Sequence, residues 1–319
     1  MKISVVIPTK NNALTIEKAM DSVLKSLARI DNPWEIVVVD AHSTDGTLEI
    51  LRKYSDYIKV IGDEGRGIGA ARNLGVRNST GDVIFFVDAD CIVKPDHFSK
   101  LLRAFDGNTG IVWTSGLSFR LPSKKEYRLQ AAHLEAYSAI EEPNKEGESQ
   151  IASTALLAVR RDVFEEIGGF WEHPFASEDM DFSYRVLKAG YKIRKVRTKS
   201  ISLPRMTLRD MVRQQVWYGK GASIIYHKYR KDRKFWKIHG WNVLFRLGSP
   251  FNYISFILGV LISLFVSISL MFFFSPSLSL KKRRFVRLSP LSALIFDIVD
   301  RAAYLWGLLV GLKELKEYQ

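Results

Sequence analysis

Apolar runs alternate with helical periodicities through the first hundred residues of the chain. Residues 3–7, 35–39 and 83–87 are apolar runs, apart from Ser4 and Glu35, and are typical of parallel strands covered on both faces. Between the first two, apolar side chains recur at helical spacing over residues 16–30, which predicts a helix packed on the sheet. Further helices are expected at residues 47–54, 68–78 and 95–105, with a short strand at 58–61. The alternation predicts a doubly wound α/β fold.

Polar clusters follow three of the predicted strands at their carboxyl ends. They are Pro8, Thr9 and Asn11 after the first strand, Asp40 after the second, and Asp88 with Asp90 after the strand at 83–87. In open α/β sheets, ligands bind at this edge. The three clusters therefore predict a binding site there.

The acids Asp88 and Asp90 lie two positions apart at a strand end, so both carboxylates point to the same side. Close carboxylates repel each other unless a cation lies between them. Mg²⁺ and Mn²⁺ bind carboxylate oxygens together with substrate phosphates. The glycine-rich turn at residues 65–69 and Arg72 can hold the rest of a diphosphate. The pattern predicts a Mg²⁺ or Mn²⁺ site that binds a nucleoside-diphosphate compound.

The glycines at positions 65, 67 and 69 suggest a dinucleotide-binding fingerprint, but their place in the chain excludes it. That fingerprint follows the first strand directly and precedes an acid about 20 residues on. Here the first strand is followed by Pro-Thr-Lys-Asn-Asn, and the sequence has no Gly-Lys-Ser/Thr phosphate loop.

Several motifs resemble those of glycosyltransferase family 2 enzymes, which have the GT-A fold. They are residues 5–9 and 37–47, the Gly-x-x-x-Ala-Arg-Asn stretch ending at Asn73, Asp88-Ala89-Asp90, Gly168-Gly169-Phe170, and Ser177-Glu178-Asp179-Met180-Asp181 with Arg185. The resemblance covers roughly residues 1–230. It implies a GT-A domain at 1–230, a UDP- or GDP-linked sugar donor, a divalent metal, and transfer with inversion at the anomeric carbon.

The resemblance also implies a role for each matching residue. Pro8, Thr9 and Asn11 would line the base and ribose pocket, Asp40 would accept a hydrogen bond from the nucleobase, Gly69 and Arg72 would approach the donor, Asp88 would bind ribose and metal, and Asp90 metal and diphosphate. Two departures, Asn12 and Ala41 where the family often has acids, leave the choice between uracil and guanine open.

The acid pair Glu178-Asp179 begins a predicted helix that continues through Leu187. A carboxylate near a helix N-terminus stays ionised, as a general base must. An alternative is that these residues only cap the helix. With the two acids upstream, we favour Asp179 as the catalytic base, with Glu178 positioning the acceptor or holding Arg185.

Arg209 and Arg213 lie four residues apart on a predicted helix and share a face that can grip a phosphate. With Arg185 and Trp217 they form the predicted acceptor or phosphate-binding group, and a merely solvated basic helix is the alternative. The expected acceptor is the hydroxyl of a lipid-linked or cell-surface glycan. A polyprenyl phosphate, which needs no base, and a non-catalytic nucleotide-sugar-binding protein remain as alternatives.

The last third of the chain carries most of the positive charge. The net charge is +13, and from Lys228 onwards 15 Lys and Arg face 5 Asp and Glu, a surplus of 10. The 25 residues 251–275 carry no charge and span roughly 37 Å as a helix, against a bilayer core of ~30 Å. We predict a basic juxtamembrane segment at 231–250 and membrane-associated helices at 251–319. Of these, 251–275 would span the membrane, and an apolar helix at 291–312 would pair with it or lie in the interface.

Location follows from these features and from the absence of a signal peptide in the sequence. A single cysteine suits a reducing compartment. The basic surplus lies beside the apolar segment, so we expect a membrane partner and no nucleic acid. Since nucleotide sugars are made in the cytosol, the predicted location is the cell membrane, with the catalytic domain facing the cytoplasm.

Overall fold

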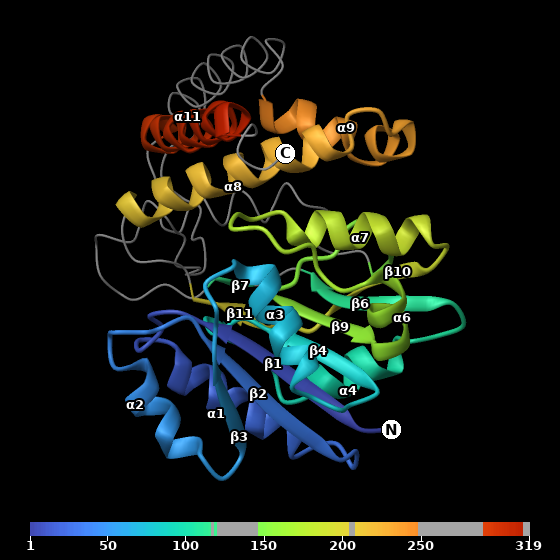
Figure 1. Cartoon of the computed structure of the whole chain (residues 1–319). Helices are drawn as coiled ribbons and strands as arrows, with labels where there is room; N and C mark the ends of the chain where they lie inside the picture. The colour runs from blue at the N-terminus through green and yellow to red at the C-terminus, as the bar shows by residue number, and fades with distance from the viewer. Residues whose placement is uncertain (116–117, 120–145, 204–207, 248–289, 315–319) are drawn as a thin grey trace, which may run out of the picture.

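An eight-stranded mixed sheet organises the protein in the computed structural model, which describes residues 1–115, 118–119, 146–203, 208–247 and 290–314 (Figure 1). Its order is β3-β2-β1-β4-β9-β6-β10-β8. The strands are β1 (Ile3–Thr9), β2 (Trp34–Asp40), β3 (Ile58–Gly62), β4 (Val83–Val87), β6 (Thr109–Ser115), β8 (Gly147–Ser149), β9 (Leu156–Arg160) and β10 (Lys192–Arg197). A small second sheet contains β5 (Cys91–Ile92), β11 (Ile201–Ser202) and β7 (Ser118–Phe119).

The predicted α/β fold is confirmed, and the predicted parallel order holds for the first half of the sheet. Strands β3, β2, β1 and β4 are parallel neighbours. The doubly wound pattern does not extend further, because β9 runs antiparallel to both β4 and β6. β9 runs back from the edge where β4 ends, and the N–H of Asp88 donates to the carbonyl of Ala155 at 2.9 Å.

Helices cover both faces of the sheet because its strands are apolar on both sides. The helices α1 (Ile16–Leu27), α2 (Thr47–Leu51) and α4 (His97–Arg103) pack on one face, and α3 (Ile68–Arg77), α6 (Arg161–Ile167) and α7 (Glu178–Lys188) on the other. A 3₁₀ turn, Arg52–Tyr54, continues α2. Val5 and Ile7 enter the first core and Val6 the second, as the alternation of a strand requires.

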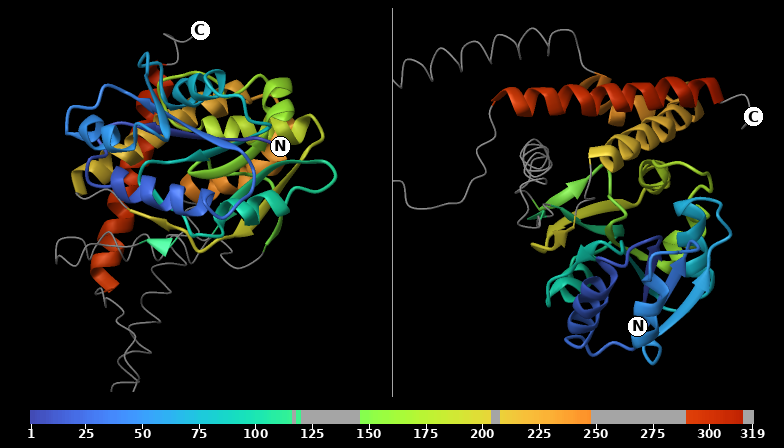
Figure 2. Two further views of the ribbon diagram at one scale, coloured as in Figure 1. Left: turned by 90° about the horizontal axis from the view of Figure 1, so that it is seen from below. Right: turned by 90° about the vertical axis from the view of Figure 1, so that its left-hand side faces the viewer.

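In the described part of the C-terminal region, three helices lie beyond α7, on the side away from the sheet (Figures 1 and 2). They are α8 (Leu208–Lys228), α9 (Arg233–Leu247) and α11 (Pro290–Glu314). Tyr184 of α7, Ile225 of α8 and Phe235 of α9 form a buried cluster that joins this layer to the domain. The first turn of α7 is also bound to the end of α8, through Asp181 and Lys228.

Helix α11 packs along α8 with the two backbones in close approach. A Cβ on Gly219 would collide with the carbonyl of Tyr304, and one on Gly307 would collide with that of Val216. Lys220 of α8 also binds Glu314 of α11, with its Nζ 2.7 Å from the nearer carboxylate oxygen. The two helices therefore form one unit.

The predicted membrane-spanning segment, 251–275, lies outside the described residues. Within the part of the chain that the structure describes, no helix is both long and apolar enough to cross a bilayer. The predicted helix at 291–312 exists as α11, but its main contact is with α8, a partner that the sequence prediction did not name. The glycines of both helices allow that packing.

Candidate functional site

The ends of three parallel strands are aligned at one edge of the sheet. Thr9, the last residue of β1, pairs with Asp40, the last residue of β2, and Asp40 pairs with Gly62 at the end of β3. β4 ends at Val87, so Asp88 continues the same edge. The predicted polar clusters after these strands therefore share an edge.

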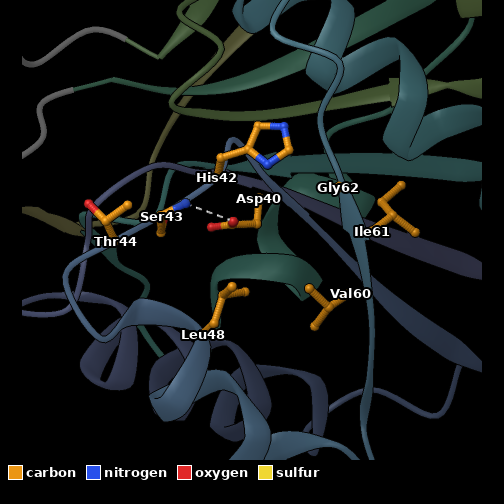
Figure 3. A pocket seen from close by; sticks show the side chains of 8 residues that line it. All are labelled: Asp40, His42, Ser43, Thr44, Leu48, Val60, Ile61 and Gly62. Atoms are coloured by element: carbon orange, nitrogen blue, oxygen red, sulfur yellow. Dashed lines mark hydrogen bonds between the residues drawn. The ribbon is translucent and has the colours of Figure 1, made fainter.

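A hollow of about 360 Å³ opens beside Asp40 (Figure 3). His42 lies on one side of the Asp40 carboxylate, and Leu48 and Val60 lie on the other. The Asp40 side chain is buried, and its Oδ2 accepts a hydrogen bond from the Ser43 N–H at 2.9 Å. Its Oδ1 is also buried and has no hydrogen-bond partner among the described residues. A buried acceptor without a partner is costly, so a ligand N–H would be bound favourably here.

The loops around the hollow hold each other in a strained conformation. Asn11 and His42 have φ of 54° and 55°, in the left-handed region that side chains rarely adopt. The Asn11 N–H donates to Ser43 Oγ and the Thr44 N–H donates to Asn11 Oδ1, both at 2.8 Å. Asn11 therefore shapes the wall of the hollow.

Of the predicted base and ribose residues, Asp40 is the one that lines the hollow. Pro8 and Thr9 are buried within β1. His42 and the β3 residues Val60 and Ile61 also line it. The sequence analysis did not single out these three residues. The signal available for Val60 and Ile61 was their position near the carboxyl end of a predicted strand.

Arg72 is fully buried at the centre of the site. Its guanidinium donates to Asp88 Oδ1 at 2.8 Å and to Glu178 Oε1 at 2.5 Å. Burial lowers the pKa of Arg72, but the charges of Asp88 and Glu178 outweigh it and hold that pKa above its ordinary value. Thr154 also donates to Glu178, at 3.2 Å. Arg72 thus joins α3, the end of β4 and the first turn of α7.

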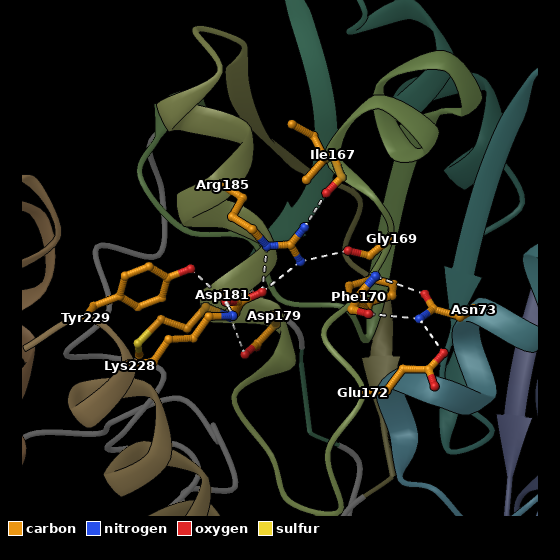
Figure 4. A network of polar contacts seen from close by, with 11 residues as sticks. Asn73, Ile167, Gly169, Phe170, Glu172, Asp179, Asp181, Arg185, Lys228 and Tyr229 are labelled. Carbon is orange, nitrogen blue, oxygen red and sulfur yellow. Dashed lines mark hydrogen bonds and ion pairs between the residues drawn. The ribbon is translucent and has the colours of Figure 1, made fainter. Parts of the chain in front are cut away.

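The contact between Arg72 and Glu178 corrects one of the two roles predicted for Glu178, that of holding Arg185. The other role, positioning the acceptor, stays a prediction. Arg185 is instead bound by Asp181, one helical turn before it, with Nη2 and Oδ2 2.7 Å apart. The remaining donors of Arg185 reach the carbonyls of Ile167 and Gly169 at 2.6 and 2.7 Å (Figure 4). These contacts hold the guanidinium within the protein.

The residues around Asp88 fit a hard divalent cation. The Asp88 side chain is 29% exposed, and Asp90 is half-buried two positions on. Among the described residues, no three His, Cys, Asp or Glu side chains gather into a metal site. Mg²⁺ and Mn²⁺ commonly use only one or two carboxylates and complete their shell with phosphate and water oxygens. Asp88 and Asp90 supply that number.

The first turn of α7 presents three acids in different environments. Asp179 is half-buried, and its Oδ1 accepts a hydrogen bond from the Met180 N–H at 2.7 Å. Asp181 is fully buried and accepts hydrogen bonds from Lys228, the last residue of α8, at 2.7 Å and from Tyr229, which follows it, at 2.8 Å (Figure 4). Burial raises the pKa of Asp181, but Arg185 and Lys228 outweigh it and lower that pKa. Asp181 is therefore a structural anion.

Helix α8 carries the other predicted acceptor residues. Arg209 and Arg213 are exposed near its start. Trp217 is half-buried and donates from Nε1 to the Pro174 carbonyl at 3.1 Å. Gly69, predicted to approach the donor, is buried in α3, where a Cβ would lie 2.7 Å from the Trp171 carbonyl. Its position is thus explained by packing against the segment that precedes α7.

A family model, Glycosyl transferase family 2, matches residues 4–168, about half of the chain. The chain belongs to glycosyltransferase family 2. This transferase is 28% identical over 259 residues to glycosyltransferase AglE of Haloferax volcanii, covering 79% of this chain and 84% of that protein. It is 27% identical over 205 residues to the O-antigen chain rhamnosyltransferase RfbN of Salmonella typhimurium, covering 60% of this chain and 63% of that protein.

Solved structures confirm the GT-A-like fold of the transferase. The mannosyltransferase PcManGT from Pyrobaculum calidifontis, in complex with GDP-Man and Mn²⁺, superposes with a TM-score of 0.60 at 19% identity, covering 95% of this chain and 87% of that chain. TarS from S. aureus in complex with UDP-GlcNAc gives 0.53 at 17% identity, covering 100% of this chain and 93% of that chain. At these identities the similarity concerns the fold.

The Arg72 bridge predicts a large loss of stability for Arg72→Met. The variant leaves Asp88 and Glu178 without their cation, and breaking a buried ion pair costs about 3–5 kcal/mol. Urea unfolding should therefore show a lower midpoint. Arg77→Met is the matched control, because this side chain at the end of α3 is 52% exposed and should cost roughly 0.5 kcal/mol or less. Equal midpoints for the two variants would contradict the assigned role of Arg72.

Proposed function

We propose that this enzyme transfers a sugar from a UDP- or GDP-linked donor to a hydroxyl of a lipid-linked or cell-surface glycan. Transfer would invert the anomeric carbon and depend on Mg²⁺ or Mn²⁺. The observation that carries the proposal is the unpartnered Asp40 Oδ1 in the hollow, at the same sheet edge as Asp88 and Asp90. The bound GDP-Man with Mn²⁺ in PcManGT, and UDP-GlcNAc in TarS, support such a donor.

The hollow suits a nucleobase. Leu48 and Val60 offer an apolar surface to a planar ring, with the His42 imidazole across from them. The Asp40 Oδ1 would accept the base N–H, while Oδ2 keeps its bond to Ser43. One ring N–H, as in uracil or guanine, satisfies this requirement.

The diphosphate would lie near Asp88 and Asp90. A divalent cation bound there would neutralise the charge that grows on the leaving diphosphate. Arg72 binds Asp88 from the buried side and so fixes the carboxylate for that task. In this proposal Arg72 acts on the donor through Asp88.

Asp179 is the proposed general base. The acceptor oxygen attacks the anomeric carbon, and its proton passes to the Asp179 carboxylate. The bond between the anomeric carbon and the diphosphate oxygen breaks, and its electron pair leaves with the nucleoside diphosphate. The helix N-terminus favours the carboxylate form of Asp179. Glu178 and Asp181 are buried, whereas Asp179 is half-buried, so Asp179 is the acid of this turn that we assign to the proton.

We further propose a membrane location with the catalytic domain on the cytoplasmic side. Trp306, Leu309 and Leu312 of α11 are 63%, 60% and 45% exposed. Exposed cations of α9, which contacts α11, include Arg233, Lys234 and Lys237. An apolar and basic surface suits an anionic lipid interface. The uncharged residues 251–275 lie between these two helices in the chain.

The base assignment predicts that Asp179→Asn retains donor binding but loses turnover by about 10²–10⁴-fold. Turnover is the release of UDP or GDP with water as the acceptor. Asp162→Asn is the matched control, because Asp162 also lies in the first turn of a helix and accepts the next backbone N–H, at 2.9 Å. If helix capping were the only role of Asp179, both variants would turn over normally. If Asp179→Asn turned over normally with polyprenyl phosphate but not with water, the result would favour a phosphate acceptor.

The hollow predicts that UDP-GlcNAc or GDP-Man, with Mn²⁺, raises the melting temperature of the enzyme by mass action. Asp40→Asn should weaken that binding by about 10–100-fold, because a hydrogen bond to a charged acceptor is lost. Asp63→Asn is the control: Asp63 is also buried after a neighbouring strand, but it lies outside the hollow and binds the Gly65 N–H at 3.2 Å. Binding that is indifferent to Asp40, or to removal of Mn²⁺ by EDTA, would contradict the assigned base pocket or metal site respectively.

The membrane proposal predicts that a polarity-sensitive dye on Leu309→Cys emits blue-shifted light in vesicles of phosphatidylglycerol and phosphatidylcholine. Leu14→Cys is the control, since Leu14 is 76% exposed on the catalytic domain. The native Cys91 is buried, which raises the pKa of its thiol and protects it from labelling. Equal emission from both labels would place the α11 face in water.

A further inference from the structure

The segment 171–177, which leads into α7, is packed between two glycines from distant parts of the chain. A Cβ on Gly67, just before α3, would collide with the carbonyl of His173. A Cβ on Gly221, in α8, would collide with the carbonyl of Ala176. The backbone of this segment is therefore fixed on both sides by contacts that any larger residue would disturb.

One face of α8 contacts the 171–177 segment and the start of α7. Trp217 donates to the Pro174 carbonyl at 3.1 Å, one turn before Gly221. Lys228, two turns after Gly221, lies 3.8 Å above the Trp171 ring and binds Asp181 at 2.7 Å. Positions separated by four and seven residues share a helix face. The position of α8 therefore determines the position of the segment.

A second face of α8 packs against α11. The contacts of Gly219 with Tyr304 and of Val216 with Gly307 leave no room for the helices to approach more closely. A displaced 171–177 segment consequently cannot be accommodated by a shift of α8 towards α11. Strain from a new side chain at position 221 would be passed to the segment and to the first turn of α7.

We infer that Gly221 is a positioning residue that sets the place of Asp179 relative to Asp88. The inference rests on the proposed function, in which Asp179 is the base. On the donor side, the Arg72 guanidinium links the two acids, since it lies 2.5 Å from the Glu178 carboxylate and 2.8 Å from that of Asp88. On the acceptor side, Gly221 and Trp217 hold the segment that leads into Ser177, whose φ of 82° is strained. The two restraints together orient the first turn of α7.

The test is Gly221→Ala in the full chain, compared with Gly240→Ala. Both replace a glycine in a helix, but a Cβ at position 240 of α9 meets no atom within 4 Å. The turnover number for release of UDP or GDP from UDP-GlcNAc or GDP-Man should fall about 10²-fold in Gly221→Ala, the effect of a displacement of about 1 Å at a reacting group. The KM for the donor and its binding in the thermal-shift assay should match the wild type, and Gly240→Ala should keep normal turnover.

A purely local role for Gly221 gives a different result. Alanine is a better helix former than glycine, so Gly221→Ala would then melt at a higher temperature and keep its turnover number, which would overturn the inference. Should Gly221→Ala fail to fold, Trp217→Phe removes the hydrogen bond to Pro174 but keeps an aromatic ring, and it should lower the turnover number with an unchanged donor KM. Normal turnover of Trp217→Phe would then overturn the inference.

The outcomes also separate this inference from the proposed function. If Asp179→Asn is inactive while Gly221→Ala and Trp217→Phe are fully active, the base assignment stands and only the positioning role is overturned. Fully active Asp179→Asn would overturn the base assignment, and the positioning role with it.

Discussion

The guanidinium of Arg72 is the interaction on which the arrangement of the site depends. It is surrounded by protein, so its charge must be balanced locally, and Asp88 and Glu178 supply that balance from two different elements. One cation shared between two anions leaves this group with a formal charge of −1. That remaining charge favours a further cation beside Asp88, the more exposed of the two acids. The same three side chains thus stabilise the fold and would attract the proposed metal.

The acids of the site differ in what surrounds them, and this separates their roles. Asp181 is balanced by Arg185 and Lys228 and serves the packing of α7 on α8. Asp40 has one satisfied oxygen and one buried oxygen without a partner among the described residues, which suits recognition of a ligand N–H. Asp179 is half-buried at a helix start, where a carboxylate favours its anionic form. In the proposed function, aspartates in different environments would thus serve structure, binding and proton transfer.

The sequence predicted the features that depend on local pattern. Apolar runs identified β1, β2 and β4, and the strand-end rule put Asp40 and Asp88 at one edge. Periodicity carries no information on strand direction, so the antiparallel β9 could not be anticipated. The partner of Glu178 was also missed, because Arg72 lies 106 residues away and meets it only in the folded chain. The glycine-rich turn was noticed for phosphate binding, but Gly67 and Gly69 face the backbone before α7, and a sequence cannot distinguish these two uses of glycine.

The packing of α11 on α8 has a consequence for the order in which the protein matures during synthesis. The chain passes from Asp40 to Lys228 before α11 begins at Pro290, so the ribosome completes the whole sheet and α8 well before the helix that fixes α8. Domains generally fold as their residues emerge, and contacts distant in sequence form late. The nascent chain would then have formed the hollow beside Asp40 while the face of α8 that contacts α11 is still uncovered. Binding of a donor and full orientation of α7 would thus be acquired at different moments of synthesis.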